Sequence, residues 1–209
     1  AELGGVVSVV AKNATHWRTT FQIVRELAES IYISNYVLGI QSQNSLEIFS
    51  YNLANNSWLG SRSHRIEGNG TSFISHDSLS LIDADDLNSG KKLILVAVSV
   101  LRQSWNLVLV MRCSIDMSCD TLIEFPVSSS SPIVDFSENG RFLAIGDANT
   151  VRVYDGLATK ELLFFTPDAL SIIHDVSVSG VDDHAVRLAI LYESGIQKEQ
   201  VLLIQEYGT

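Results

Sequence analysis

The pattern of apolar and polar positions predicts short strands, and it is clearest over residues 131–165. An alternating run there ends at Asn139-Gly140, two residue types that tolerate positive φ in a tight hairpin turn. Residues 142–146 then form an almost continuous apolar run, as expected for a strand covered on both faces. Two further apolar runs follow polar turns, and Pro167, which cannot donate to a strand ladder, ends the pattern. This stretch therefore predicts one small sheet of four antiparallel strands.

The same residues resemble a blade of the WD-repeat family. They follow that family's order of turn glycine, apolar strand, polar turn and a second apolar strand, and Tyr154-Asp155 stands where the family usually has Trp-Asp. The family's structural Asp falls on Ala148, with Asp147 and Asn149 beside it, so we do not expect its usual His-Ser-Asp-Trp network. The resemblance is faint outside residues 131–165. It implies a β-propeller and no particular activity.

Strand-like runs at similar spacing extend this interpretation to the whole chain. Two His-Asp pairs, at His76-Asp77 and His174-Asp175, lie about two repeats of 40–50 residues apart. No fourth strand is evident after the last apolar run, so we expect an N-terminal strand to pair there and complete the final blade. The expected blades of one β-propeller domain cover residues 16–68, 70–127, 131–167 and 170–209, with residues 4–10 as the closing strand.

The sequence thus predicts an all-β, β-propeller-like fold with about four blades of four antiparallel strands. Two alternatives stay open, a closed four-bladed ring and a segment of a larger propeller. The segment most open to a second interpretation is residues 19–28, for which we favour a strand over a short helix.

Composition narrows the possible functions. The chain has 209 residues, of which 46% are hydrophobic and 18% charged, as in a folded protein. A net charge of −10, with 14 Lys and Arg, argues against binding to nucleic acid. No apolar run reaches the roughly 18 residues of a membrane span, and no signal-like segment begins at Ala1. The sequence does not determine the compartment, although we favour the cytoplasm over secretion. Because no initiator Met is present, we expect a processed product or an excised segment.

Two types of covalent modification are suggested by the sequence. Cys113 and Cys119 are close enough for a disulfide across a hairpin, with two unlinked thiols in neighbouring strands as the alternative. Sequons for N-glycosylation occur at Asn13, Asn55 and Asn69, although a chain this rich in Asn, Ser and Thr carries about two by chance. The sequons are therefore weak evidence for secretion.

Several polar segments resemble metal-binding or catalytic sites, but we prefer a structural role for each of them. The acidic segment at residues 83–90 lacks the spacing and the final Glu of a calcium loop, so we interpret it as a solvated loop. Residues 182–184 are interpreted as a polar hairpin turn. His76 and His174 recur at equivalent repeat positions, which suits a structural role better than acid-base catalysis. No motif of a nucleophile, zinc site or phosphate loop occurs, so we expect no enzyme activity, no metal and no cofactor.

Three tryptophans carry the remaining hint of function. Trp17, Trp58 and Trp105 fall near the ends of predicted strands, where an aromatic ring can anchor a protein partner or stack on a sugar. Packing between blades is the alternative that we favour for each one. We therefore predict a non-enzymatic protein-protein interaction scaffold, and the alternative is a carbohydrate-binding or glycan-processing propeller. The sequence does not identify the partner.

Overall fold

The computed structural model describes the chain except for residues 1–4, 14–15, 26–29, 34–36, 43–44, 53–56, 59–61, 65–70, 74–78, 86–91, 115–118, 139, 156–159, 183–184 and 209. Every regular element in the described residues is a β-strand, and all strand pairs are antiparallel. The prediction of an all-β fold built from small antiparallel sheets is confirmed.

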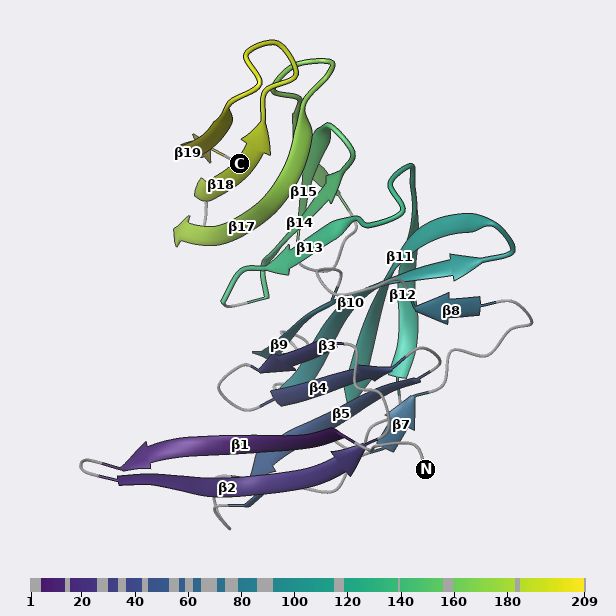
Figure 1. Ribbon diagram of the computed structural model, residues 1–209, viewed down its shortest axis with the longest axis vertical. Coiled ribbons are helices and arrows are strands. Elements are labelled where there is room, and N and C mark those ends of the chain that lie inside the picture. The colour runs from purple at the N-terminus through teal and green to yellow at the C-terminus, as the bar shows by residue number, and fades with distance from the viewer. Residues whose placement is uncertain are drawn as a thin grey trace.

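The strands form five sheets that follow one another along the chain (Figure 1). The first sheet is a hairpin of β1 (Gly5–Asn13) and β2 (His16–Arg25). The second contains β3 (Ser30–Ile33), β4 (Val37–Ser42), β5 (Ser45–Asn52), β6 (Ser57–Trp58) and β7 (Arg62–His64). The third contains β8 (Thr71–Phe73), β9 (Leu79–Asp85), β10 (Lys92–Arg102), β11 (Trp105–Ser114) and β12 (Cys119–Val127). The fourth contains β13 (Ile133–Phe136), β14 (Phe142–Asp147), β15 (Thr150–Asp155) and β16 (Glu161–Phe165), and the fifth β17 (Ile172–Asp182), β18 (Ala185–Glu193) and β19 (Gln200–Gly208).

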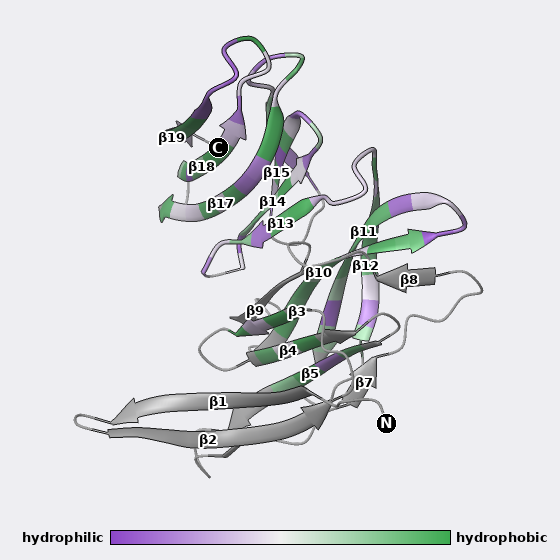
Figure 2. Cartoon of the chain, in the orientation of Figure 1, coloured by the Kyte–Doolittle hydropathy of each residue, from purple (hydrophilic) through white to green (hydrophobic). Residues whose placement is uncertain are grey.

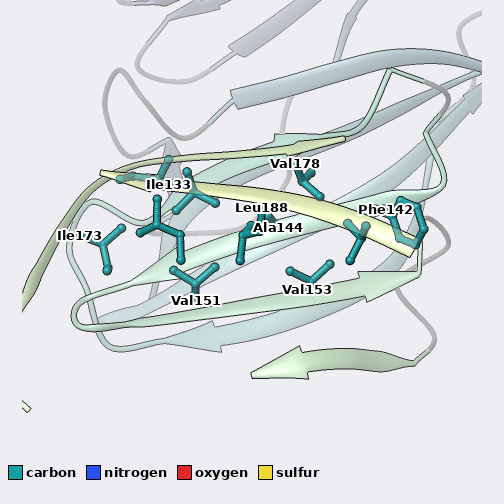
Figure 3. Packing of buried hydrophobic residues seen from close by; sticks show 11 residues of the cluster. Ile133, Phe142, Ala144, Val151, Val153, Ile173, Val178 and Leu188 are labelled. Atoms are coloured by element: carbon teal, nitrogen blue, oxygen red, sulfur yellow. The ribbon is translucent and has the colours of Figure 1, made fainter. Parts of the chain in front are cut away.

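The last four sheets pack face to face in chain order through three hydrophobic clusters. The first cluster joins β5 to β10 and β11, and includes Ile48, Val96 and Met111. The second joins β10 and β11 to β13, β14 and β15, so the third sheet is covered on both faces. The third joins the β13–β16 sheet to the β17–β19 sheet, as Figure 3 shows for Ala144 and Leu188. This stacking of small meandering sheets is β-propeller-like, as predicted.

Local patterns explain the central strands. Phe142 to Ile145 of β14 are all buried, because β14 lies between two covered faces. Over residues 176–179 of β17 hydrophobic and hydrophilic positions alternate, because Val176 and Val178 pack against the β13–β16 sheet while the residues between them point the other way (Figure 2). Gly140 has a φ of 69°, the left-handed conformation expected for the turn between β13 and β14.

The turn between β14 and β15 connects three sheets. The carboxylate of Asp147 accepts hydrogen bonds from the backbone N–H of Ser128, at 3.0 Å, and from that of Ser129, at 2.7 Å, in the segment that follows β12. The carbonyl of Ala148 accepts the N–H of Ile173 at 3.0 Å, at the start of β17. The position at which this chain departs from the WD-repeat pattern therefore carries inter-sheet hydrogen bonds of its own.

A second inter-sheet contact comes from Asp135 on β13. Its carboxylate accepts the backbone N–H of Val178 on β17 at 2.9 Å. Burial raises the pKa of Asp135 above its usual value, and the hydrogen bonds from Val178 and Ser177 oppose that shift. Part of the link between the last two sheets thus depends on a half-buried carboxylate.

Residues 4–10 were expected to pair with the final strand, but residues 5–10 belong to β1, and among the described strands β1 does not pair with β19. β1 pairs instead with β2, from Gly5 opposite Arg25 to Asn13 opposite His16. In Figure 1 this hairpin lies at the opposite end of the molecule from β19. Only two residues separate Asn13 from His16, and closing so short a loop costs less entropy than joining the two ends of a ring.

Candidate interaction surfaces

The turn between β10 and β11 presents an exposed tryptophan. Gln103 and Ser104 have φ values of 49° and 73°, the two successive positive values that characterise a tight two-residue hairpin. Trp105 directly follows this turn, and 69% of its surface is exposed. Leu101, 37% exposed, precedes the turn, and Arg102 beside it forms an ion pair with Glu124 at 2.8 Å. The hairpin therefore holds a large aromatic ring in solvent on a well-defined backbone.

The other predicted contact residues are placed less completely. Trp17 lies on β2 and Trp58 lies on β6, but the structure does not describe their side chains. Asn13 is the last residue of β1, while Asn55 and Asn69 lie outside the described residues. Among the three tryptophans predicted to contact a partner, Trp105 is the one whose solvent exposure the structure describes.

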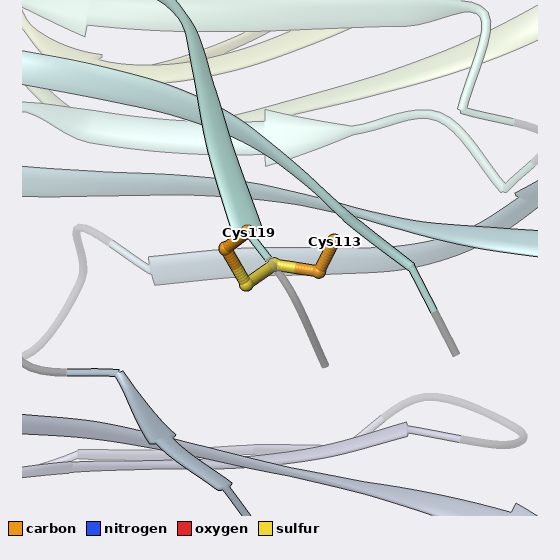
Figure 4. The surroundings of a disulfide bond; sticks show 2 residues. All are labelled: Cys113 and Cys119. Atoms are coloured by element: carbon orange, nitrogen blue, oxygen red, sulfur yellow. A yellow bond between two sulfur atoms is a disulfide. The ribbon is translucent and has the colours of Figure 1, made fainter. Parts of the chain in front are cut away.

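The structure joins Cys113 and Cys119 in a disulfide (Figure 4). The two residues lie directly opposite each other on β11 and β12, with their Cα atoms 4.0 Å apart. Cys113 is fully buried in the cluster between the second and third sheets. The disulfide therefore fixes the end of the β11–β12 hairpin against that core.

The outer face of the β17–β19 sheet carries apolar side chains in solvent. We define this face by the residues of the sheet that point away from the β13–β16 sheet. Leu202 and Ile204 of β19 lie on it, with 63% and 61% of their surfaces exposed. In the register of the sheet, Leu202 is opposite Leu191 and Ile204 is opposite Ala189 on β18. An ion pair between Arg187 of β18 and Glu206 of β19 lies on the same outer face.

The candidate catalytic and metal-binding groups remain dispersed. His174 lies on β17 with its Nε2 atom 3.8 Å from Oε2 of Glu193, and the next residue, Asp175, accepts the N–H of Val176. Asp83 and Asp85 belong to β9, whereas the rest of the acidic segment is outside the described residues. Within the described part of the chain, no group of three or more His, Cys, Asp or Glu side chains could hold a metal ion. No helix in that part is long and apolar enough to cross a membrane.

Comparison with known proteins gives no family. No family model and no curated protein matches the sequence. Solved structures with similar folds include Hsv2 from Kluyveromyces lactis, at 12% identity and a TM-score of 0.34, covering 91% of this chain and 77% of that one. The WD40 domain of SCAP from fission yeast is 13% identical with a TM-score of 0.45, and the alignment covers 97% of this chain and 62% of that domain. Raptor from Chaetomium thermophilum aligns at 10% identity and a TM-score of 0.35, over 88% of this chain and 21% of its own.

Sequence reasoning missed the exposed apolar face of the last sheet. Residues 201–204 form a continuous apolar run like that of β14, which would predict burial on both faces. In the structure only the side chains at alternate positions, such as Leu203, pack against the core. The apolar run predicts a strand, but the sequence does not show which of its two faces packs against the preceding sheet.

Proposed function

We propose that this chain is a non-enzymatic scaffold for protein-protein interactions, built as a single β-propeller domain or as a segment of a larger propeller. The WD-repeat resemblance of residues 131–165 and the chain-ordered stacking of the sheets support a repeat of related blades. Such folds host many unrelated functions, so the proposal depends on a surface feature and not on the fold.

The observation that carries the proposal is the exposure of Trp105. Burying a ring of this size on a partner releases a large apolar area from water, and Trp is enriched among the residues that dominate binding energy. The two-residue turn holds the neighbouring backbone in place before binding, which lowers the entropy lost on association. The ion pair between Arg102 and Glu124 supplies polar groups at the edge of the same hairpin.

Affinity capture followed by a measurement of Kd tests this proposal. Replacing Trp105 with Ala should weaken binding by about 2 kcal/mol, or about thirtyfold in Kd, as for a typical hot-spot residue. Phe164→Ala is the matched control, because Phe164 is an exposed aromatic residue on a different sheet. Equal binding by wild type and Trp105→Ala would contradict the role of this hairpin.

The same ring supports the second candidate function, carbohydrate binding. An exposed Trp can stack on the apolar face of a sugar, and a glycan array with wild type and Trp105→Ala would detect this activity. Glycan processing normally needs two carboxyl groups placed across the scissile bond, and Glu124 beside the hairpin is already paired with Arg102. Glycan binding that disappears in Trp105→Ala, without hydrolysis, would favour a carbohydrate-binding propeller over a protein scaffold.

A further inference from the structure

The disulfide between Cys113 and Cys119 joins two strands that are already paired. β11 and β12 form an antiparallel ladder of their own, and the two cysteines are its last pair, next to Arg112 opposite Asp120. The sequence separation of the cysteines is 6, so the bond closes a short loop and adds less stability than one that closes a long loop. The hairpin can therefore stay folded with the disulfide or without it.

The two strands lie closer together at the disulfide than paired strands usually do. Residues directly opposite each other in an antiparallel pair have Cα atoms about 4.5 or 5.5 Å apart. Between Cys113 and Cys119 this distance is 4.0 Å, which is also below the range of about 4.4–6.8 Å that is usual for disulfides. A disulfide outside that range is more easily reduced, because breaking the bond lets the strands return to their ordinary spacing.

The two cysteines differ in their access to solvent. Cys113 is fully buried in the cluster that also contains Ile48 and Met111, whereas Cys119 is half-buried and packs against that cluster. A thiolate that arrives from solvent therefore attacks Sγ of Cys119, and Cys113 is the leaving group. The released Cys113 takes up a proton, because an apolar site favours the neutral thiol over the thiolate.

We propose that the Cys113–Cys119 disulfide is a reversible redox switch, which a dithiol reductant opens without unfolding the chain. The first thiolate of the dithiol forms a mixed disulfide with Cys119 as the Cys113–Cys119 bond breaks. The second thiolate attacks this mixed disulfide and releases Cys119, so that both cysteines are reduced and the dithiol is oxidised to a disulfide. Exchange with an oxidised dithiol closes the switch. This switch goes beyond the scaffold function and does not depend on Trp105.

Reduction changes the contact between the second and third sheets. Once the bond is broken, the two sulfur atoms separate to van der Waals distance. Cys113 is held in a closely packed interior, so the half-buried Cys119 is the residue that moves. The end of the β11–β12 hairpin then loses its attachment to the cluster that contains Ile48 of β5. The face of the third sheet towards the fourth keeps its own cluster, so the change stays on one side of the third sheet.

Thiol trapping under native conditions tests whether the switch opens without unfolding. The wild-type chain is incubated with dithiothreitol at several urea concentrations below the unfolding transition, and the free thiols are alkylated and counted by mass. The rate of reduction should not depend on urea, because the native chain is the species attacked, and oxidised dithiothreitol should restore the bond. A rate that rises with urea along the full slope of global unfolding would mean that only the unfolded chain is reduced, and would overturn the proposal.

Two single variants test which sulfur is attacked. Cys113→Ala leaves Cys119 as a free thiol, and Cys119→Ala leaves Cys113. An aromatic disulfide reagent should react with Cys119 at least about tenfold faster than with Cys113, because Cys119 is the one that solvent reaches. Equal rates in two variants that both melt cooperatively would overturn the proposed exchange at Cys119.

Amide hydrogen exchange then tests the structural consequence. Reduction of the wild-type chain should speed exchange at Arg112 and Asp120 by about tenfold or more, and should leave exchange at Leu143 on β14 unchanged. The double variant Cys113→Ala with Cys119→Ala is the control, which should exchange fast at the first two positions without reductant and should not respond to it. Equal exchange in the oxidised and reduced wild-type chains would overturn the switch.

Discussion

Replacing Leu143 with Ala should destabilise the fold strongly, because this side chain lies at the centre of the stacked sheets. Leu143 is on β14 and is fully buried. It lies opposite Phe136 on β13 and Tyr154 on β15, and belongs to the cluster that also contains Val108 and Val110 of the third sheet. The substitution therefore removes atoms from the contact between two sheets.

The size of the effect follows from the atoms removed. Three buried carbons are lost, and at about 0.8 kcal/mol each their transfer to water accounts for about 2.5 kcal/mol. A cavity adds to this loss where the neighbours cannot close it, and here the neighbours are held in paired strands on both sides. We expect a total loss of about 3–4 kcal/mol, within the range of about 2–5 kcal/mol typical of such substitutions.

Urea denaturation of the two proteins measures this difference as a shift in midpoint at constant slope. Leu170→Ala is the control, because 70% of the Leu170 surface is exposed and its loss should cost less than about 0.5 kcal/mol. A loss below about 1 kcal/mol for Leu143→Ala, or equal losses for the two variants, would refute the packing of the third sheet on the fourth.

Three further predictions concern other parts of the fold. Replacing Cys113 and Cys119 together with Ala should lower the unfolding free energy by about 2 kcal/mol, since a disulfide with a sequence separation of 6 closes a short loop, and a reductant should lower the urea midpoint of the wild type alone. Gly195→Ala should cost about 1–3 kcal/mol in the same denaturation assay, because the added Cβ would collide with the backbone of Leu170, and an unchanged midpoint would contradict that contact. Asp135→Asn should raise the thermal midpoint at pH 7, because the raised pKa of Asp135 means that its charged form destabilises the folded state. That advantage should disappear as the pH falls from the folded-state pKa towards 3.8, where the wild-type carboxyl becomes protonated in both states, and an advantage independent of pH would exclude this cause.

The fourth sheet could be predicted because its signals are local. An Asn-Gly turn, a continuous apolar run and a polar turn define β13, β14 and β15 without reference to distant residues, and the predicted run at residues 142–146 lies within β14. Of the segment 19–28, for which a strand was favoured over a helix, residues 19–25 belong to β2, and residues 26–28 lie outside the described residues. Hairpins of this kind depend on turn residues and alternation that a single sequence displays.

Partner choice between distant strands could not be predicted. The β-branched run in β1 indicates a strand, but nothing in its composition distinguishes pairing with β2 from pairing with β19. The hydrogen bonds of Asp147 and Asp135 were missed for a related reason, since the donor of each bond lies outside the sheet that carries the accepting carboxylate. The exposure of Trp105 depends on which face of the third sheet each neighbour covers, which spacing alone does not show.

From the second sheet to the last, sheets adjacent in sequence pack face to face. Nuclear Overhauser contacts between assigned methyl groups test it most directly for the last two sheets. The structure predicts cross-peaks from the methyl groups of Ala144 and Val153 to those of Val178 and Leu188, which belong to one buried cluster (Figure 3). Well-resolved methyl signals without these cross-peaks, or with contacts from β1 to β19 in their place, would contradict the stacked arrangement.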